Sequence, residues 1–166
     1  MLIAIISDIH DNLSNLEKCL NWCRNNKIEK IICLGDVTNK DTLHYLAGQF
    51  AGEIFLVRGA ELYDERELKK YKNVINGGLV ARREFDGITI GFGHRPQDVE
   101  PLSAVRSDSV GLDFVFCGHT HKPWLENRGA LTLANPGNLA NVFYAPTFAV
   151  LDTVTKKLAL KILTDL

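Results

Sequence analysis

Short apolar runs recur along the chain, and each ends where polar or glycine residues begin. Continuous apolar runs of this length are typical of strands that are buried on both faces of a sheet. The runs predict five strands, at Leu2–Ile6, Lys30–Leu34, Ile54–Val57, Ile88–Ile90 and Phe114–Cys117.

Helical patterns lie between the first of these runs. Ser14-Asn-Leu-Glu17 matches a capping box and predicts the start of a helix. The apolar positions spaced along one face of that helix are Leu13, Leu16, Leu20 and Cys23. Further helices are predicted over Asp41–Phe50 and Val99–Asp108. Alternating strands and helices indicate βαβ units, so the sheet is expected to begin with parallel strands.

The pattern changes after about residue 120, where only strands and turns are predicted. The expected strands are Pro123–Glu126, Leu131–Ala134, Thr147–Leu151 and Lys157–Leu163. We therefore expect an α/β sandwich with a more antiparallel second half. The chain has 166 residues and shows no linker, repeat or low-complexity stretch, so a single domain over residues 1–166 is expected.

Composition narrows the classes of function. The chain is 46% hydrophobic and 23% charged, with a formal net charge of −1, so it has no electrostatic footprint for nucleic acid or an anionic membrane. The first apolar run is too short for a signal peptide and no stretch is long enough to span a bilayer, which favours a cytoplasmic protein. The four cysteines lack Cys-x-x-Cys spacing and are expected to be small buried side chains.

Carboxylates and imidazoles follow the predicted strands. Asp8 and His10 come after the first strand, Asp36 after the second, and His119 and His121 after a run that breaks at Gly118. Ligands in an open α/β sheet bind beyond the carboxyl ends of its strands. Taken alone, Asp8, His10 and Gly35-Asp36 are more typical of a helix cap or a turn, and the pair His119 and His121 is equally compatible with a solvated turn. Together they predict a site for a divalent transition metal such as Mn, Fe, Zn, Co or Ni.

The ordered motifs Asp8-x-His10, Gly35-Asp36, Gly118-His-Thr-His121 and Asn135-Pro-Gly137 resemble those of the calcineurin-like metallophosphoesterases, in their small prokaryotic phosphodiesterase branch. The resemblance spans nearly the whole chain. It implies a four-layer α-β-β-α sandwich with two metal ions, and hydrolysis of a small phosphodiester or phosphomonoester by a metal-bound hydroxide.

The resemblance also assigns roles to individual residues. By position, Asp8, His10, Asp36 and His121 correspond to the first metal centre. Asp36 corresponds to the bridge between the metals, and His119 to a ligand of the second. His94 and Asn12 correspond to residues that orient the phosphate, although Asn12 is equally compatible with a helix N-cap.

The sequence departs from the family pattern at the second centre. Ala60 stands where the family has an asparagine ligand, and Phe92 where it has a histidine ligand. Glu61 and His94 are the nearby side chains that could replace them. With two ligands missing, we expect a weakened second site and weak activity. The alternative is an inactive binding or scaffold protein of the same fold. A milder departure is Asn138, at a position where serine is usual.

Overall fold

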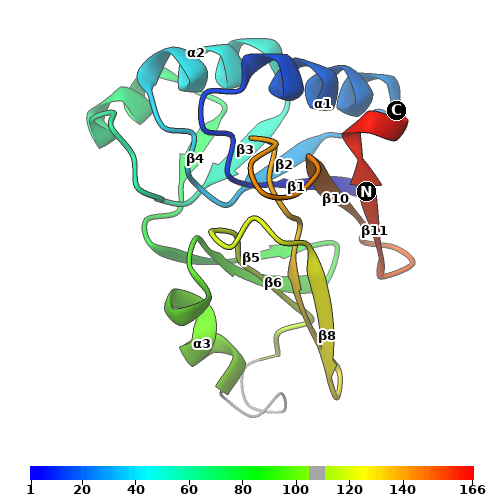
Figure 1. Ribbon diagram of the computed structural model, residues 1–166. Helices are drawn as coiled ribbons and strands as arrows, with labels where there is room; N and C mark the ends of the chain where they lie inside the picture. The colour runs from blue at the N-terminus through cyan, green and yellow to red at the C-terminus, as the bar shows by residue number, and fades with distance from the viewer. Residues whose placement is uncertain (105–110) are drawn as a thin grey trace.

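The computed structural model describes residues 1–104 and 111–166, which form two β-sheets with helices on their outer faces (Figure 1). The first sheet has the order β11-β10-β1-β2-β3-β4. Its strands are β1 (Leu2–Ile6), β2 (Lys30–Cys33), β3 (Glu53–Leu56), β4 (Val74–Asn76), β10 (Thr147–Asp152) and β11 (Lys157–Ile162). Strands β1 to β4 pair in parallel, and β10 and β11 add an antiparallel edge.

The second sheet has the order β5-β6-β7-β9-β8. Its strands are β5 (Val80–Phe85), β6 (Ile88–Gly93), β7 (Phe114–Phe116), β8 (Trp124–Arg128) and β9 (Leu131–Asn135). The central strands β6, β7 and β9 are parallel, and each edge strand is antiparallel to its neighbour. The second sheet is thus mixed, with a parallel centre and antiparallel edges.

Three apolar cores hold four layers together. Helices α1 (Leu13–Asn25) and α2 (Lys40–Gln49) pack against the outer face of the first sheet. The second core lies between the two sheets, and the third lies between the second sheet and α3 (Pro96–Ala104). This is the four-layer α-β-β-α sandwich that the family resemblance implied, because each sheet buries one face against its partner and the other under helices.

The helices differ in detail from those predicted. Asn12, rather than Ser14, caps α1, since its side chain accepts the amide of Asn15. Ser14 therefore lies inside the helix, and Leu13 is exposed instead of buried. The helix predicted over Val99–Asp108 begins earlier as α3, and its last residues lie outside the described part of the chain.

The sequence did not predict β4, β5 or the 3₁₀ turns at Glu65–Lys70 and Leu163–Asp165. β5 alternates buried and exposed residues and carries two arginines and a glutamate, so it contains no continuous apolar run. All four cysteines are buried and unpaired, as predicted. Within the described residues, no helix combines the length and apolarity that crossing a bilayer requires.

Candidate metal centre

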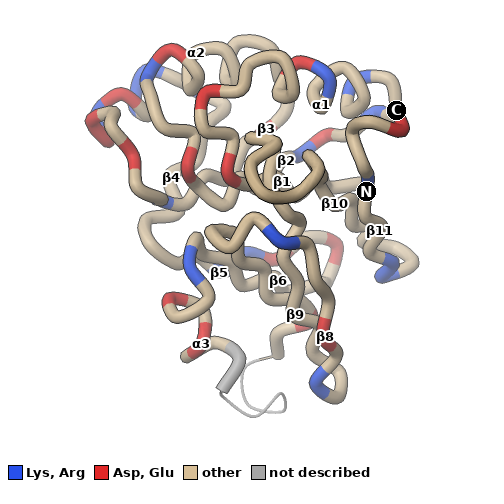
Figure 2. Tube along the Cα trace, viewed as in Figure 1, with Lys and Arg blue, Asp and Glu red and all other residues tan. Residues whose placement is uncertain are grey.

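Loops from both sheets meet at one edge of the sandwich. The first sheet contributes the loops after β1 and β2, and the second sheet those after β6 and β7. In Figure 2, acidic segments of the first-sheet loops face the second sheet. The side chains at this junction form two groups, each with donor atoms within 4.8 Å of one another: Asp8, His10 and His121 in the first, and Asp36, His94 and His119 in the second.

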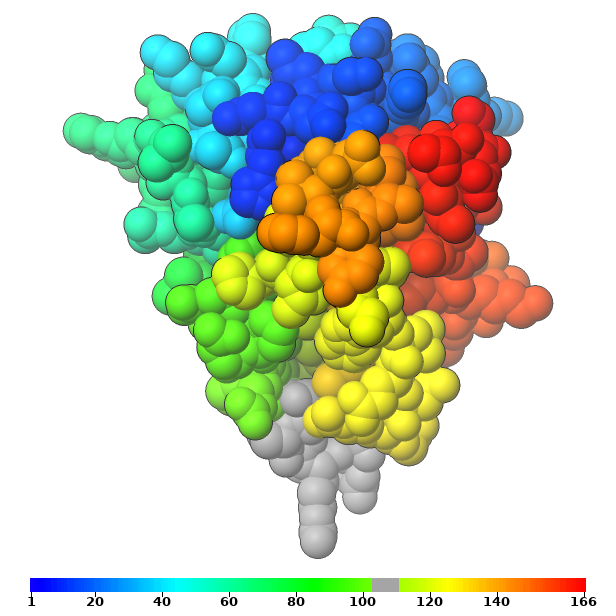
Figure 3. Space-filling view, viewed as in Figure 1, coloured from blue at the N-terminus to red at the C-terminus, as the bar shows by residue number. Residues whose placement is uncertain are grey.

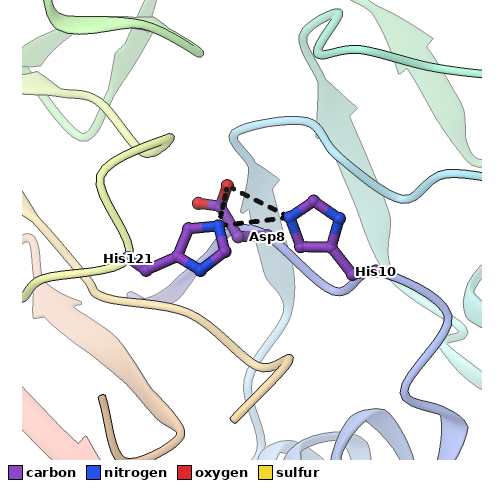
Figure 4. Close-up of side chains that lie close together, drawn as sticks. All are labelled: Asp8, His10 and His121. Carbon is purple, nitrogen blue, oxygen red and sulfur yellow. Dashed lines mark hydrogen bonds and ion pairs between the residues drawn. The ribbon is translucent and has the colours of Figure 1, made fainter. Parts of the chain in front are cut away.

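In the first group, three donor atoms converge on one point (Figure 4). Nε2 of His121 lies 3.2 Å from Nε2 of His10 and 3.3 Å from Oδ1 of Asp8. Oδ1 of Asp8 is 3.8 Å from Nε2 of His10. Ligands about 2.0–2.1 Å from one four-coordinate ion are separated from one another by about 3.3 Å. The spacing therefore suits a single metal ion.

The carboxylate of Asp8 is oriented by protein donors on one side only. Its Oδ2 accepts the hydroxyl of Ser7 and the backbone amide of His119. Its Oδ1 is buried and has no hydrogen-bond partner within the described residues. An unpaired buried carboxylate oxygen is costly. A cation between Oδ1 and the two imidazoles would remove that cost, so these residues fit a metal.

Gly118 permits this close approach. A Cβ atom there would lie 1.9 Å from Oγ of Ser7 and 2.8 Å from Oδ2 of Asp8. Any side chain would push Ser7 and Asp8 away from the His119 amide. The break of the apolar run at Gly118 is therefore what lets the two sheets share one site.

The second group is arranged in the same way. Nε2 of His94 lies 3.3 Å from Oδ2 of Asp36 and 3.2 Å from Nδ1 of His119. Nδ1 of His94 lies 2.8 Å from the carbonyl oxygen of Leu34. Because a carbonyl only accepts, Nδ1 carries the proton, and Nε2 can present its lone pair to an ion.

Asp36 lies between the two groups. Its Oδ2 is 3.3 Å from His94 Nε2 in the second group and 3.5 Å from His10 Nε2 in the first. Its Oδ1 accepts the backbone amide of Ala60, which fixes the orientation of the carboxylate. This position is the one that a carboxylate needs in order to bridge two ions.

The charges at the junction are mutually dependent. Burial favours the neutral form of Asp36, but the hydrogen bond and attraction from His94 outweigh it and lower the pKa of Asp36 to about 2. The pKa of His10 is raised, chiefly by its interaction with Asp8. Burial opposes the charged form of His94, but Asp36 and Asp8 raise its pKa overall. The carboxylates thus attract positive charge, which protons or a metal could supply.

The backbone is unusual at the same residues. A positive φ is uncommon outside glycine and costs about 1–3 kcal/mol per residue, and such residues cluster at functional sites. Five of the six group members have φ between +43° and +68°: Asp8, His10, Asp36, His119 and His121. These left-handed residues turn the chain sharply at the strand ends, which aims their side chains inward.

The positions expected to be vacated ligands are placed differently from one another. Ala60 lies on the loop after β3, beside Asp36, as expected. Phe92 is fully buried in the core between the sheets and contributes no atom to either group. The inward-facing residues of β6 follow the two-residue period of a strand, and His94 continues that row beyond Phe92. His94, expected to orient the phosphate, therefore lies beside Asp36 and His119, where its imidazole could hold an ion.

Glu61 does not replace the missing asparagine. Its two carboxylate oxygens accept the backbone amides of Thr38 and Gly59. Burial raises its pKa above the ordinary value for a glutamate. Glu61 therefore ties the loops after β2 and β3 together, and its side chain is directed at backbone amides.

Asn12 has the capping role that was the alternative to a phosphate contact. Its Oδ1 accepts the amide of Asn15 and its Nδ2 donates to the carbonyl of Ala140. Ser7, which orients Asp8, was not predicted as a site residue, although it lies between a strand of the apolar core and the candidate ligand.

Comparison with known proteins places these residues in context. The model of the calcineurin-like phosphoesterase superfamily domain matches residues 1–156. Phosphodiesterase MJ0936 of Methanocaldococcus jannaschii is 27% identical over 165 residues, which cover 95% of this chain and 96% of that protein. Vacuolar protein sorting-associated protein 29 of Schizosaccharomyces pombe is 29% identical over 141 residues, 83% of this chain and 72% of that one. The fold matches the solved structure of an archaeal phosphodiesterase with a TM-score of 0.86, at 24% identity, over 98% and 99% of the two chains.

Proposed function

The chain belongs to the calcineurin-like phosphoesterase superfamily, a family of hydrolases, and on that premise we propose that it is a metal-dependent phosphoesterase acting on a small phosphorylated substrate. The relatives that are named phosphodiesterases favour a phosphodiester over a phosphomonoester. No basic surface suited to nucleic acid is indicated by the net charge of −1.

One observation carries this proposal: the two groups of donor atoms converge on adjacent points and Asp36 lies between them. Asp8, His10 and His121 would hold the first ion and His94 and His119 the second, with Asp36 shared. Two imidazoles and a carboxylate in each group suit Mn, Fe, Zn, Co or Ni. Four of the five histidines of the chain belong to these groups.

Bound divalent ions would activate water and neutralise charge on the phosphate. The protein residues keep both positions fixed. Ser7 and the His119 amide hold Asp8, the Leu34 carbonyl holds His94, and the Ala60 amide holds Asp36. These partners orient the donors before an ion arrives, which raises affinity because less ordering remains to be done.

We propose that the second centre is the weaker one. Its described side-chain donors come from Asp36, His94 and His119, because the methyl group of Ala60 offers none. Three ligands are more than the two expected from the sequence but fewer than the four of the full pattern. Activity below that of relatives with the asparagine ligand is expected, since clamping both the attacking and leaving oxygens requires two ions.

The proposal is tested by hydrolysis of bis(p-nitrophenyl) phosphate with and without added Mn²⁺. The expected result is metal-dependent turnover that Asp36→Asn abolishes and that His44→Ala leaves unchanged. His44 is the matched control because it is the one histidine of the sequence outside both groups. Metal-independent turnover, or equal turnover in Asp36→Asn, would contradict the proposal.

The second candidate is a binding or scaffold protein that retains the fold without catalysis. Ala60 at a ligand position favours it, and so does the likeness to vacuolar protein sorting-associated protein 29. The same assay separates the two functions. A protein that binds Mn²⁺ in both groups but hydrolyses neither a phosphodiester nor a phosphomonoester would be of this second kind.

A further inference from the structure

A cavity of about 260 Å³ opens beside the second group. His94 and His119 form part of its wall, and Gly59 and Ala60 form another part. The cavity is therefore continuous with the position at which a substrate phosphate would meet the second ion. The short side chain at Ala60 leaves space that an asparagine would fill.

Two arginines, Arg58 and Arg95, also line this cavity. Arg58 directly precedes the Gly59–Ala60 turn, and Arg95 directly follows the ligand His94. Figure 2 shows a basic segment on the loop that runs from β6 into α3. The two guanidinium groups thus come from different sheets and reach the same cavity.

Each arginine pairs with one carboxylate, which does not occupy all of its N–H donors. Nε and Nη2 of Arg95 donate to Asp98, at 2.9 and 3.0 Å. Nη1 of Arg58 lies 3.2 Å from Oε1 of Glu65. A guanidinium group has five N–H donors, so each arginine keeps donors for a ligand. The acidic partners restrict its orientation, which reduces the ordering needed on binding.

We infer that this cavity binds a second phosphate group of the substrate, so that the physiological substrate carries two phosphates. This inference rests on the proposed function, which places the scissile phosphate at the adjacent ions. A planar guanidinium matches the geometry of phosphate oxygens, and two of them can contact one phosphate. A substrate with a single phosphate would leave the cavity without an anion.

The test compares thymidine 3′,5′-bisphosphate with thymidine 5′-monophosphate by isothermal titration of the Mn²⁺-loaded protein. The wild type is expected to bind the bisphosphate about tenfold more tightly, the effect of one or two charge-assisted hydrogen bonds at a partly exposed site. Arg58→Met and Arg95→Met keep side-chain bulk and remove charge, so each should reduce this preference several-fold. Arg58→Lys should retain part of it.

Arg128→Met is the matched control. Arg128 also pairs with an exposed carboxylate, Glu126, but lies on β8 and does not line this cavity. The preference of the Arg128→Met variant for the bisphosphate should equal that of the wild type. Equal affinity of the wild type for both ligands, or an unchanged preference in Arg58→Met and Arg95→Met, would overturn the inference.

Hydrolysis of bis(p-nitrophenyl) phosphate, measured on the same preparations, separates this inference from the proposed function. Turnover without any preference for the bisphosphate leaves the function standing and overturns the second-phosphate site. A preference that depends on both arginines, without turnover, supports the site and contradicts the proposed function.

Discussion

Single atoms decide what the junction can bind. Asp8 turns one oxygen toward protein donors and leaves the other buried and unpaired, facing His10 and His121. His94 turns one ring nitrogen toward a carbonyl and the other toward Asp36. In both residues, the hydrogen bond on one side of the group fixes which atom faces the candidate metal position on the other side. Replacing a single donor atom should therefore change metal binding in a predictable way.

Asp8→Asn removes the charged donor of the first group. We expect metal affinity to fall about 100-fold or more, since even outer-shell changes cost 10–100-fold. The free energy of unfolding of the metal-free variant should change little, because asparagine keeps an oxygen that accepts Ser7 and the His119 amide and removes the negative charge from Oδ1, which has no hydrogen bond. Elemental analysis and chemical denaturation measure the two effects. Asp41→Asn, at an exposed position in α2, is the control, and equal metal content in Asp8→Asn would contradict the assignment.

Ala60 and Phe92 should respond oppositely to substitution. Ala60→Asn adds an amide oxygen beside Asp36, and the affinity of the second site should rise about tenfold. Ala60→Leu has similar volume without a donor atom and should show no gain in metal affinity.

Phe92→His places an imidazole in the core between the sheets, so it should lower the free energy of unfolding by roughly 2–4 kcal/mol and add no metal. Metal stoichiometry and denaturation across the three variants check this.

Asn138 connects a candidate ligand to the loop after β9. Its buried amide donates to the carbonyls of His121 and Tyr144, and its oxygen accepts the amide of Val142. The loop after β9 lies against the start of the chain in Figure 3, where the amides of Leu139 and Ala140 donate to the backbone carbonyl of Asp8. The longer side chain therefore spans contacts that serine could not reach.

Asn138→Ser should lower the free energy of unfolding by about 1 kcal/mol, because the part-buried carbonyls of His121 and Tyr144 lose the amide that donates to them. Chemical denaturation measures this change. Asn21→Ser, at an exposed position on α1, should stay within about 0.5 kcal/mol of the wild type. Equal stability of the two variants would mean that Asn138 does not anchor the loop.

At the scale of elements, the strands were the most predictable feature of the sequence. Buried strands such as β1 and β2 read as unbroken apolar runs, and their carboxyl ends carry Asp8 and Asp36. β5 escaped prediction because an edge strand with one exposed face mixes charged and apolar residues. β4 has three residues, too few to show a period.

The candidate site could be predicted where a ligand directly follows an apolar strand. It was harder to predict where the direction of a side chain depends on the alternation of residues along the strand. His94 was predicted to orient the phosphate from its place after the motif glycine, but its side chain continues the inward-facing row of β6 and points toward Asp36. A one-residue difference in extended chain reverses the face, and a motif cannot fix that. Asn12 was ambiguous because its Oδ1 can cap a helix and its Nδ2 can donate to a phosphate, and the sequence does not show which role it takes.

Asp113 links three elements of the second half of the chain. One carboxylate oxygen accepts the amide of Thr89 in β6, and the other accepts Lys156 from the turn between β10 and β11. Burial favours the neutral acid, but the bond from Lys156 and the Thr89 amide outweigh it and lower the pKa of Asp113. The charged form is thus the one that the fold stabilises.

Asp113→Asn keeps an acceptor for Thr89 and removes the charge that faces Lys156. Because the folded pKa is lowered, the stabilisation is complete above the unfolded value of about 4 and is lost as pH falls below it. We expect a deficit of up to about 1 kcal/mol at pH 7 that disappears toward pH 3, given the partial exposure of the pair. Urea denaturation of both proteins from pH 3 to 7 measures it. A deficit independent of pH would indicate lost packing instead.

At the scale of the whole molecule, each donor group takes ligands from both sheets. Asp8 and His10 follow β1 in the first sheet, and His121 follows β7 in the second. Asp36 follows β2, and its partners His94 and His119 follow β6 and β7. An ion in either group would therefore link the two sheets at this edge, in addition to the apolar core that already joins them.

Metal binding should stabilise the folded chain as a consequence. Ligands from two sheets come together only in the native state, so the ion binds the unfolded chain far less well. At 100 times the dissociation constant the gain is about 2.7 kcal/mol, or a Tm increase of about 5–10 °C for a chain of this length. Differential scanning calorimetry with increasing Mn²⁺ measures the shift, which should keep growing with the logarithm of concentration.

Two histidine variants show whether the link between the sheets causes this shift. His121→Ala removes the second-sheet donor of the first group, so an ion there would be held only by Asp8, His10 and Asp36, which all follow strands of the first sheet. The Mn²⁺-dependent rise in Tm should then fall by more than half, because the remaining ligands follow neighbouring strands of one sheet and require no docking of the second. His44→Ala should keep the full rise. An equal rise in all three proteins would mean that Mn²⁺ stabilises the chain from another site.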